Sequence, residues 1–217
     1  MTKNTSDTIG VPVNTDYGSG TITIYYGMCG CFKYTTIQAK RGPTDIVVPS
    51  LIKPKAELSL SLLGRVPEDT EFALDRLTQL QAVFKDYVPG TTAWIERGIL
   101  DYLESWTARP ENAGARGDRA FLAPWMAAES AALPAGVPVR RVLLVMGDHD
   151  FVRDVVLAEP ARARRYPGVQ EYMSRQTEYT RFIQDNLDLD EITIIRSASD
   201  YLGGLGIYKA QHQNGKQ

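Results

Sequence analysis

Short apolar runs alternate with helical patterns along this chain, and this alternation most limits the folds open to it. The runs cover residues 21–26, 45–49, 91–95, 141–146 and 191–195. Between them, apolar side chains recur at three- and four-residue spacing, as in Ala73, Leu77 and Leu80. Strands that are apolar on both faces are typical of parallel sheets covered by helices. The pattern therefore predicts an α/β fold of three layers with a mostly parallel sheet.

The spacing of apolar residues also predicts where the helices lie. They are expected over 35–40, 69–88, 99–106, 121–133, 151–157 and 169–183. The segment 58–62 alternates leucine with serine and fits a strand or a loop, whereas the polar segment 108–119 is expected to be a loop. We expect a lead-in over 1–19, one domain over 20–209 and a polar tail over 210–217.

Composition excludes several classes of protein. The chain has 217 residues, with 24 Lys and Arg against 26 Asp and Glu, so its net charge is −2. This balance argues against a nucleic-acid partner that is held by a strong positive field. The only cysteines, Cys29 and Cys31, cannot link distant segments as in a secreted scaffold. No apolar run approaches the ~20 residues of a membrane span. We therefore expect a cytoplasmic protein without a membrane partner.

A glycine-bearing loop follows the first predicted strand and precedes the first predicted helix. The phosphate-binding pattern G-x-x-x-x-G-K-[ST] aligns with Gly27 and Lys33. In such a loop, backbone N–H groups cradle phosphate oxygens and the lysine reaches the β- and γ-phosphates. The expected nucleotide-binding residues are Gly27, Cys29, Gly30, Cys31, Phe32, Lys33, Tyr34 and Thr35. The alternative is an ordinary βα turn that happens to carry a lysine.

Two positions depart from that pattern. Phe32 stands where the second glycine is expected, and Tyr34 stands where a Ser or Thr would bind magnesium. Gly30 adds a glycine inside the loop, and Thr35 follows one residue after the magnesium-binding position. Thr35 is therefore the expected replacement ligand for the ion.

A charged pair, Glu96 and Arg97, ends the run 91–95. The carboxyl ends of parallel strands line the ligand crevice of such sheets. A carboxylate there can accept a proton from a substrate hydroxyl or hold magnesium through water, and an arginine can bind a phosphoryl group. We therefore expect Lys33, Glu96 and Arg97 to be catalytic, with Thr35 and Glu96 at the metal. An exposed ion pair at a strand end is the alternative.

Arginines gather between the last two predicted helices. Arg153, Arg162, Arg164 and Arg165 lie around Pro160 and Pro167. Arginines on a closing lid neutralise phosphate charge and exclude water during phosphoryl transfer. Arg162 and Arg164 are accordingly expected to bind the nucleotide. A solvated basic helix end is the competing interpretation.

Taken in chain order, the loop, the Glu96-Arg97 pair and the arginine stretch resemble the P-loop nucleoside and nucleotide kinases. The similarity is greatest to the thymidylate kinase and deoxynucleoside kinase group. It implies a P-loop NTPase-type fold with a five-stranded parallel sheet and a lid. It also implies ATP, Mg²⁺ and a small-molecule acceptor, with transfer of the γ-phosphate to a hydroxyl or phosphate of a nucleoside, nucleotide or related molecule.

Two other functions remain open from the sequence. Phe32 and Tyr34 are also compatible with a P-loop protein that binds a nucleotide without turnover. A sulfotransferase needs no magnesium and would tolerate Tyr34, but the histidines, His149 and His212, lie far from the loop in the sequence. An amphipathic helix such as 69–88 leaves a homodimer open.

Overall fold

The structure is a computed structural model that describes residues 20–51, 68–108 and 110–202. The predictions for 1–19, 58–62 and 210–217 lie outside the described residues. No described helix is both long enough and apolar enough to cross a membrane.

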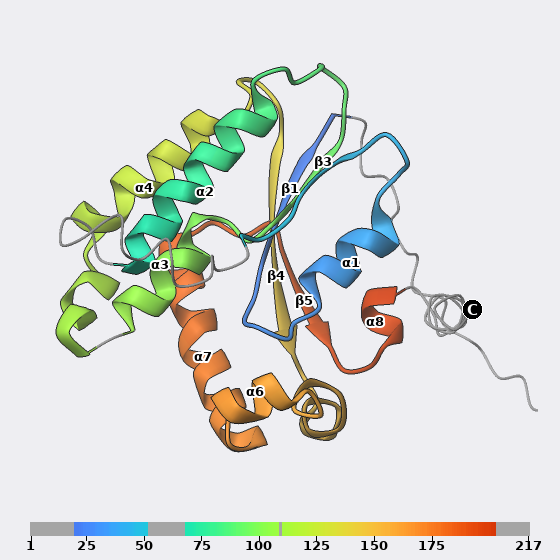
Figure 1. Cartoon of the computed structure of the whole chain (residues 1–217), viewed down its shortest axis with the longest axis vertical. Helices are drawn as coiled ribbons and strands as arrows, with labels where there is room; N and C mark the ends of the chain where they lie inside the picture. The colour runs from blue at the N-terminus through green and yellow to red at the C-terminus, as the bar shows by residue number, and fades with distance from the viewer. Residues whose placement is uncertain (1–19, 52–67, 109, 203–217) are drawn as a thin grey trace, which may run out of the picture.

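Five parallel strands form one sheet at the centre of the molecule (Figure 1). They are β1 (Ile22–Tyr26), β2 (Ile46–Val48), β3 (Ala93–Glu96), β4 (Val139–Met146) and β5 (Glu191–Ile195). Their order across the sheet is β2-β3-β1-β4-β5, and every pairing is parallel. The predicted α/β fold with a parallel sheet is therefore confirmed.

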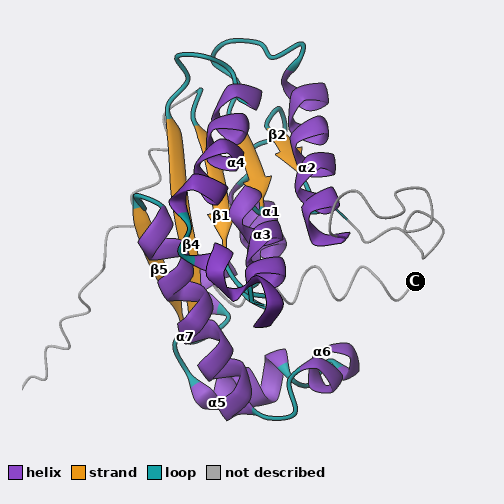
Figure 2. Cartoon of the chain, turned by 90° about the vertical axis from the view of Figure 1, so that its left-hand side faces the viewer, coloured by secondary structure: helices purple, strands orange, loops and turns teal. Residues whose placement is uncertain are grey.

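Helices cover both faces of this sheet and make the three layers. One face carries α1 (Lys33–Lys40) and α8 (Ser199–Leu202), which contact each other. The other face carries α2 (Glu68–Phe84), α3 (Ile99–Thr107), α4 (Arg119–Ala132) and α7 (Val169–Asn186) (Figure 2). Because both faces are covered, the inner strands are mostly apolar, although β4 carries Arg140 and Arg141 near its start and β3 ends at Glu96.

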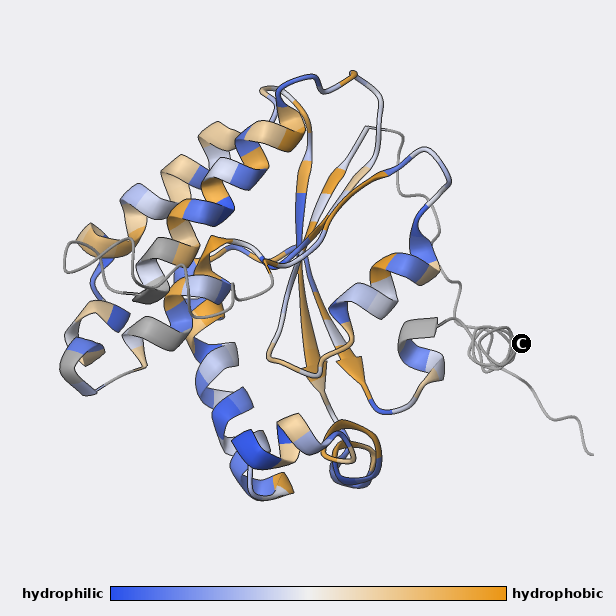
Figure 3. Ribbon diagram, viewed as in Figure 1, coloured by the Kyte–Doolittle hydropathy of each residue, from blue (hydrophilic) through white to orange (hydrophobic). Residues whose placement is uncertain are grey.

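The core lies on the two faces of the central strand. Every residue of β1 is buried, and Tyr25 stacks on Trp94 of β3 with ring centroids 6.3 Å apart. In Figure 3 the apolar colours concentrate on the strands and on the inward sides of the helices. Burial of this apolar surface is the main favourable contribution to folding.

The connections between strands create a crevice at their carboxyl ends. The chain leaves β1 toward β2 at one edge through α1, and it leaves β4 toward β5 at the other edge through α7. Neighbouring strands with connections in opposite directions leave an opening at their carboxyl ends, where ligands bind in sheets of this kind. The loop after β1 lies at this opening.

Three predicted segments differ in detail from the structure. The segment 108–119 is not simply a loop, because Pro110–Arg116 forms a 3-10 helix (η1), and the Asp118 side chain then caps α4 at Ala120 N. The segment 151–157 is a helical turn, α5 (His149–Phe151), followed by a π-helix, η2 (Val152–Val156). The arginine stretch itself is a short helix, α6 (Pro160–Arg165), in which proline occupies the favoured first turn.

Candidate active site

A cavity of about 460 Å³ opens at the carboxyl ends of the strands. Several parts of the chain line it. They include the loop after β1 (27–29), the turn and first helical residues after β3 (Arg97 and Asp101), residues of α6 and α7 (Arg165, Arg175 and Tyr179), Leu51 after β2 and Phe72 of α2. The loop, the strand end and the arginine helix that the sequence singles out therefore do meet at one cavity.

The loop after β1 has several residues in left-handed backbone conformations. Gly27 has φ 151°, Gly30 has φ 95° and Phe32 has φ 55°. Phe32 therefore adopts a conformation that favours glycine, at the position where the phosphate-loop pattern expects glycine. A bulky residue in this region is strained by roughly 1–3 kcal/mol. Packing of the Phe32 ring against Phe151, at 5.9 Å between centroids, opposes that strain.

The amine of Lys33 lies beneath this loop. Lys33 begins α1 and is only 4% exposed. Its Nζ donates to the carbonyl of Gly27 and, at 3.1 Å, to the carbonyl of Met28. Burial lowers the pKa of Lys33, and the nearby carboxylate of Asp101 offsets part of that change. Two loop carbonyls thus hold the Lys33 amine at the floor of the loop.

The two cysteines of the loop differ in their surroundings, and both are free thiols. Cys29 lines the cavity, and its carbonyl accepts a hydrogen bond from Tyr172 at 3.2 Å. Cys31 is buried, with its Sγ 3.5 Å from the Tyr172 hydroxyl. Burial raises the pKa of the Cys31 thiol. Tyr172 on α7 therefore holds the loop from one side.

The residues expected at magnesium lie away from the cavity lining. Tyr34 is 50% exposed, and Thr35 lines a second cavity of about 440 Å³ together with Gln38 and Arg41. Glu96 accepts a hydrogen bond from Ser50 N at 3.1 Å. Across 20–51, 68–108 and 110–202, no three His, Cys, Asp or Glu side chains gather as a metal site. Thr35 and Glu96 therefore do not line one common cavity.

Arg97 is held in an unusual conformation at the end of β3. Its φ is 77°, and its side chain lines the cavity with a buried Nε that has no partner among the described residues. Arg76 of α2, which is fully buried, donates to the main-chain carbonyl of Arg97 at 2.9 Å and to that of Glu96 at 2.8 Å. Strained residues held in this way concentrate at functional sites.

Asp101 is a cavity carboxylate that is linked to the loop through Tyr179. It lies in the first turn of α3 and is 9% exposed. Its Oδ1 accepts a hydrogen bond from the Tyr179 hydroxyl at 2.5 Å, and that hydroxyl accepts one from Gly27 N at 2.9 Å. Its Oδ2 is buried and meets no partner in the part of the chain that the structure describes. Burial raises the pKa of Asp101, and Lys33 and Arg97 limit the rise.

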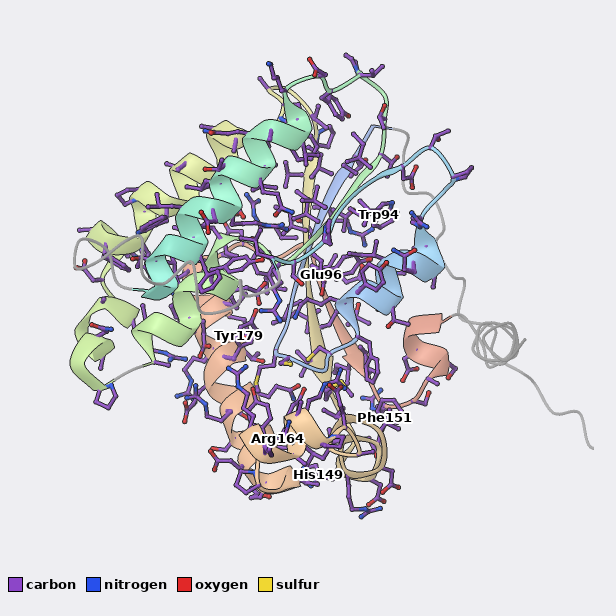
Figure 4. All side chains as sticks on the ribbon, in the orientation of Figure 1. Trp94, Glu96, His149, Phe151, Arg164 and Tyr179 are labelled. Carbon is purple, nitrogen blue, oxygen red and sulfur yellow. The ribbon has the colours of Figure 1, made fainter. Side chains whose placement is uncertain are left out.

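The arginines expected on the lid occupy different positions. Arg165 lines the cavity. The Arg162 side chain instead lies against the loop: if Gly30 carried a Cβ, that atom would lie 3.5 Å from Arg162 Cδ. Arg162 also pairs with Glu159 at 2.8 Å. Arg164 is exposed on α6, at the end of the molecule beyond the strands (Figure 4). Arg162 and Arg165 are therefore the members of this stretch that approach the site.

Asp101, Arg175 and Tyr179 are among the cavity residues that the sequence did not single out. Arg175 faces the cavity and pairs with Glu178 at 2.7 Å and Glu104 at 3.7 Å. The sequence did contain a signal that Arg175 and Tyr179 lie together. They are four residues apart in a predicted helix and therefore share one helix face. Asp101 likewise follows Arg97 by four residues, in the first turn of a predicted helix.

Comparison of the chain with protein-family models and with curated proteins gave no match. Its function must therefore be inferred from the geometry of this cavity.

Proposed function

We propose that this protein is a small-molecule kinase of the P-loop type. It would transfer the γ-phosphate of ATP to a hydroxyl or phosphate of a nucleoside, nucleotide or related molecule. One observation carries the proposal. The buried Lys33 amine lies under a left-handed loop at the carboxyl end of the central strand, beside a cavity that is lined by arginines.

The chemistry of phosphoryl transfer matches these groups. Catalysis of this reaction depends on positioning and on neutralising the charge of the phosphoryl oxygens. Bound ATP would supply the phosphoryl group. The loop and the N-terminus of α1 offer backbone N–H groups to its phosphates, and Lys33 adds a fixed positive charge. Arg97, Arg165 and Arg175 also line the cavity and carry donors that suit phosphate oxygens, beside the carboxylates of Asp101, Glu104 and Glu171.

The proposal is tested by ATP binding to the purified chain in the presence of magnesium, measured by isothermal titration calorimetry. Lys33→Met keeps much of the side-chain volume and removes the charge, and Lys33→Ala provides a second variant. Both are expected to weaken binding at least about tenfold, as for a lost charged hydrogen bond of ~1.5 kcal/mol or more. Lys40→Ala, an exposed lysine on the same helix, is the matched control. Wild-type protein without ATP binding, or Lys33 variants that bind as wild type does, would exclude the proposal.

A nucleotide-binding protein without turnover is the second candidate. Two observations favour it: Tyr34 is exposed at the magnesium position, and the loop carbonyls already hold the Lys33 amine. The two functions are separated by incubating the protein with ATP and a panel of nucleosides, nucleoside monophosphates and small polyols. Formation of ADP with a phosphorylated product supports the kinase. Tight ATP binding with neither product nor hydrolysis supports the binding protein.

A further inference from the structure

We propose that the outer edge of β5 joins a second copy of this chain. In this arrangement the two β5 strands run antiparallel, Ile192 of one copy lies opposite Ile194 of the other, and the two sheets become continuous. The proposal goes beyond the proposed kinase activity and does not depend on it, because the residues of β5 do not line the candidate active-site cavity.

β5 is the last strand of the sheet and carries an exposed apolar pair. It ends the order β2-β3-β1-β4-β5, and Figure 2 shows it at the border of the sheet. No other strand of the described residues pairs with its outer side. Ile192 and Ile194 are each 44% exposed. Single exposed apolar side chains are ordinary on protein surfaces, but two of them on an edge strand mark a place where another strand can pair.

Both isoleucines lie on the face of the sheet that carries α7. In the register of the sheet, Ile194 pairs with Val145 of β4, and Ile192 lies on the same side of its own strand. Val145 lines a small cavity of about 290 Å³ together with Gln176 and Thr180 of α7. α7 therefore covers β4 on this face, whereas the two isoleucines of β5 beside it stay open to solvent.

The main-chain groups of the two isoleucines point outward. The carbonyl of Ile195 accepts a hydrogen bond from Gly147 N at 2.7 Å, so the main chain of Ile195 faces the side of β4. Successive residues of a strand direct their N–H and C=O groups to opposite sides. The main-chain groups of Ile192 and Ile194 consequently face the outer edge, where a further strand would bind them.

A second copy of β5 fits this edge because the pairing is self-complementary. Two identical edges that are related by a two-fold axis run antiparallel. With the axis at Thr193, Ile192 of each copy lies opposite Ile194 of the other. Facing residues whose main chains point toward each other exchange both N–H···O bonds, and their side chains pack on one face. The same residues thus form the hydrogen bonds and cover the apolar pair.

The charges that flank β5 also match in this register. Asp190 and Arg196 are exposed and lie at equal distances in the sequence from Thr193, so Asp190 of one copy lies opposite Arg196 of the other. Arg196 shares a face with Ile194, because a Cβ on Gly147 would lie 3.3 Å from Arg196 Cγ and 2.3 Å from Ile194 Cγ2. Opposite charges that face each other across an antiparallel pair stabilise it. This order of acid, two apolar residues and base favours a second copy over an unrelated strand.

Sedimentation velocity on the full chain tests the proposal. With concentration rising to about 100 µM, the mass of wild type is expected to approach twice the monomer mass of 24.1 kDa. Ile194→Lys places a charge in the apolar pair, as natural edge strands do to prevent pairing, and should weaken dimerisation at least about tenfold. Because Ile194 is exposed, the variant should keep its fold, which circular dichroism verifies.

Exchange of the flanking charges supplies a second test. Asp190→Arg and Arg196→Asp each place like charges opposite one another and should weaken the dimer. The double variant restores opposite charges and should return the dimerisation constant to within about threefold of wild type. Asp190 also accepts Arg141 N at 2.7 Å, but that bond is lost in Asp190→Arg and in the double variant alike, so it cannot produce the recovery.

Leu74→Lys is the matched control. Leu74 is 45% exposed but belongs to α2, which lies away from β5 in Figure 2, so its replacement should leave dimerisation unchanged.

Four outcomes would overturn the proposal. They are wild type that stays monomeric, an unchanged dimer in Ile194→Lys, a charge exchange without recovery, and loss of the dimer in Leu74→Lys. Monomeric wild type whose Ile192 and Ile194 amides resist hydrogen exchange would show that another segment of the same chain, within 1–19 or 203–217, occupies the edge instead. None of these measurements involves ATP, so their failure leaves the proposed function standing.

Discussion

The guanidinium of Arg76 donates to the main-chain carbonyl of Arg97, through Nε at 3.2 Å and Nη2 at 2.9 Å. Arg97 has a φ of 77° and lines the cavity, so a buried arginine of α2 supports the strained turn that presents a second arginine to the site. Arg76 also binds the carbonyl of Pro49 at 2.7 Å, which fixes the end of β2 to the same point. One buried charge thus organises the carboxyl ends of two strands.

Replacing Arg76 by lysine should destabilise the fold. An ammonium group is a compact donor and cannot reproduce the planar fork that reaches Pro49, Glu96 and Arg97 together. Carbonyls that lose their partner cost about 1–3 kcal/mol each, so we expect a loss of at least ~2 kcal/mol in the free energy of unfolding. Urea denaturation measures this loss. Arg164→Lys, at an exposed position, should change stability by less than ~0.5 kcal/mol, and equal effects of the two substitutions would contradict the prediction.

The left-handed conformation of Phe32 can be tested with two substitutions that both remove the ring. Phe32→Gly and Phe32→Ala lose the same contact with Phe151, but only glycine adopts a φ of 55° without strain. We expect the glycine variant to be more stable than the alanine variant by about 1 kcal/mol. Chemical denaturation of both proteins gives the difference, and an alanine variant of equal or greater stability would show that the loop does not hold this conformation.

Gly98 should tolerate no side chain. A Cβ there would lie 2.2 Å from the Tyr26 hydroxyl oxygen and 2.4 Å from its ring carbons Cε1 and Cζ, far inside contact distance. Because Tyr26 is buried in the core beneath the turn, Gly98→Ala should cost at least about 1–3 kcal/mol. A Cβ on Gly114 would have no atom of the described residues within 4 Å, so Gly114→Ala is the control for the loss of a glycine. Thermal unfolding of the two variants compares them, and similar melting temperatures would refute the predicted clash.

Asp101→Asn should stabilise the protein at neutral pH. Burial raises the pKa of Asp101 in the folded chain above its ordinary value of 3.8, so the folded chain binds this proton more tightly than the unfolded chain. Stability is therefore lost as the pH rises from about 4 through the folded-state pKa. The variant lacks this loss, so its free energy of unfolding should exceed that of wild type at about pH 7. Below about pH 4 the two free energies should become equal. Urea denaturation at a series of pH values measures both free energies of unfolding. A difference between variant and wild type that does not change with pH would contradict the prediction.

The coarse fold followed from local patterns in the sequence. The runs near 21–26, 91–95 and 141–146 are apolar on both faces, and such strands must be covered by helices on both sides. The spacing of Gly27 and Lys33 likewise located the loop that forms one wall of the cavity, and the position of Arg97 at a strand end located another. These features depend on residues that are near one another in the chain, so the sequence alone determined them.

The tertiary structure decided which groups complete the cavity. Asp101 was not singled out in the sequence, because its importance depends on Tyr179 and Gly27, which reach it from other elements. Glu96 has a suggestive position in the sequence, but Ser50 N occupies its carboxylate. How deeply a side chain is buried, and which hydrogen bonds it makes, are decided only when distant segments pack together. The sequence therefore determined the sheet and the loop, and only packing decided which carboxylate faces the cavity.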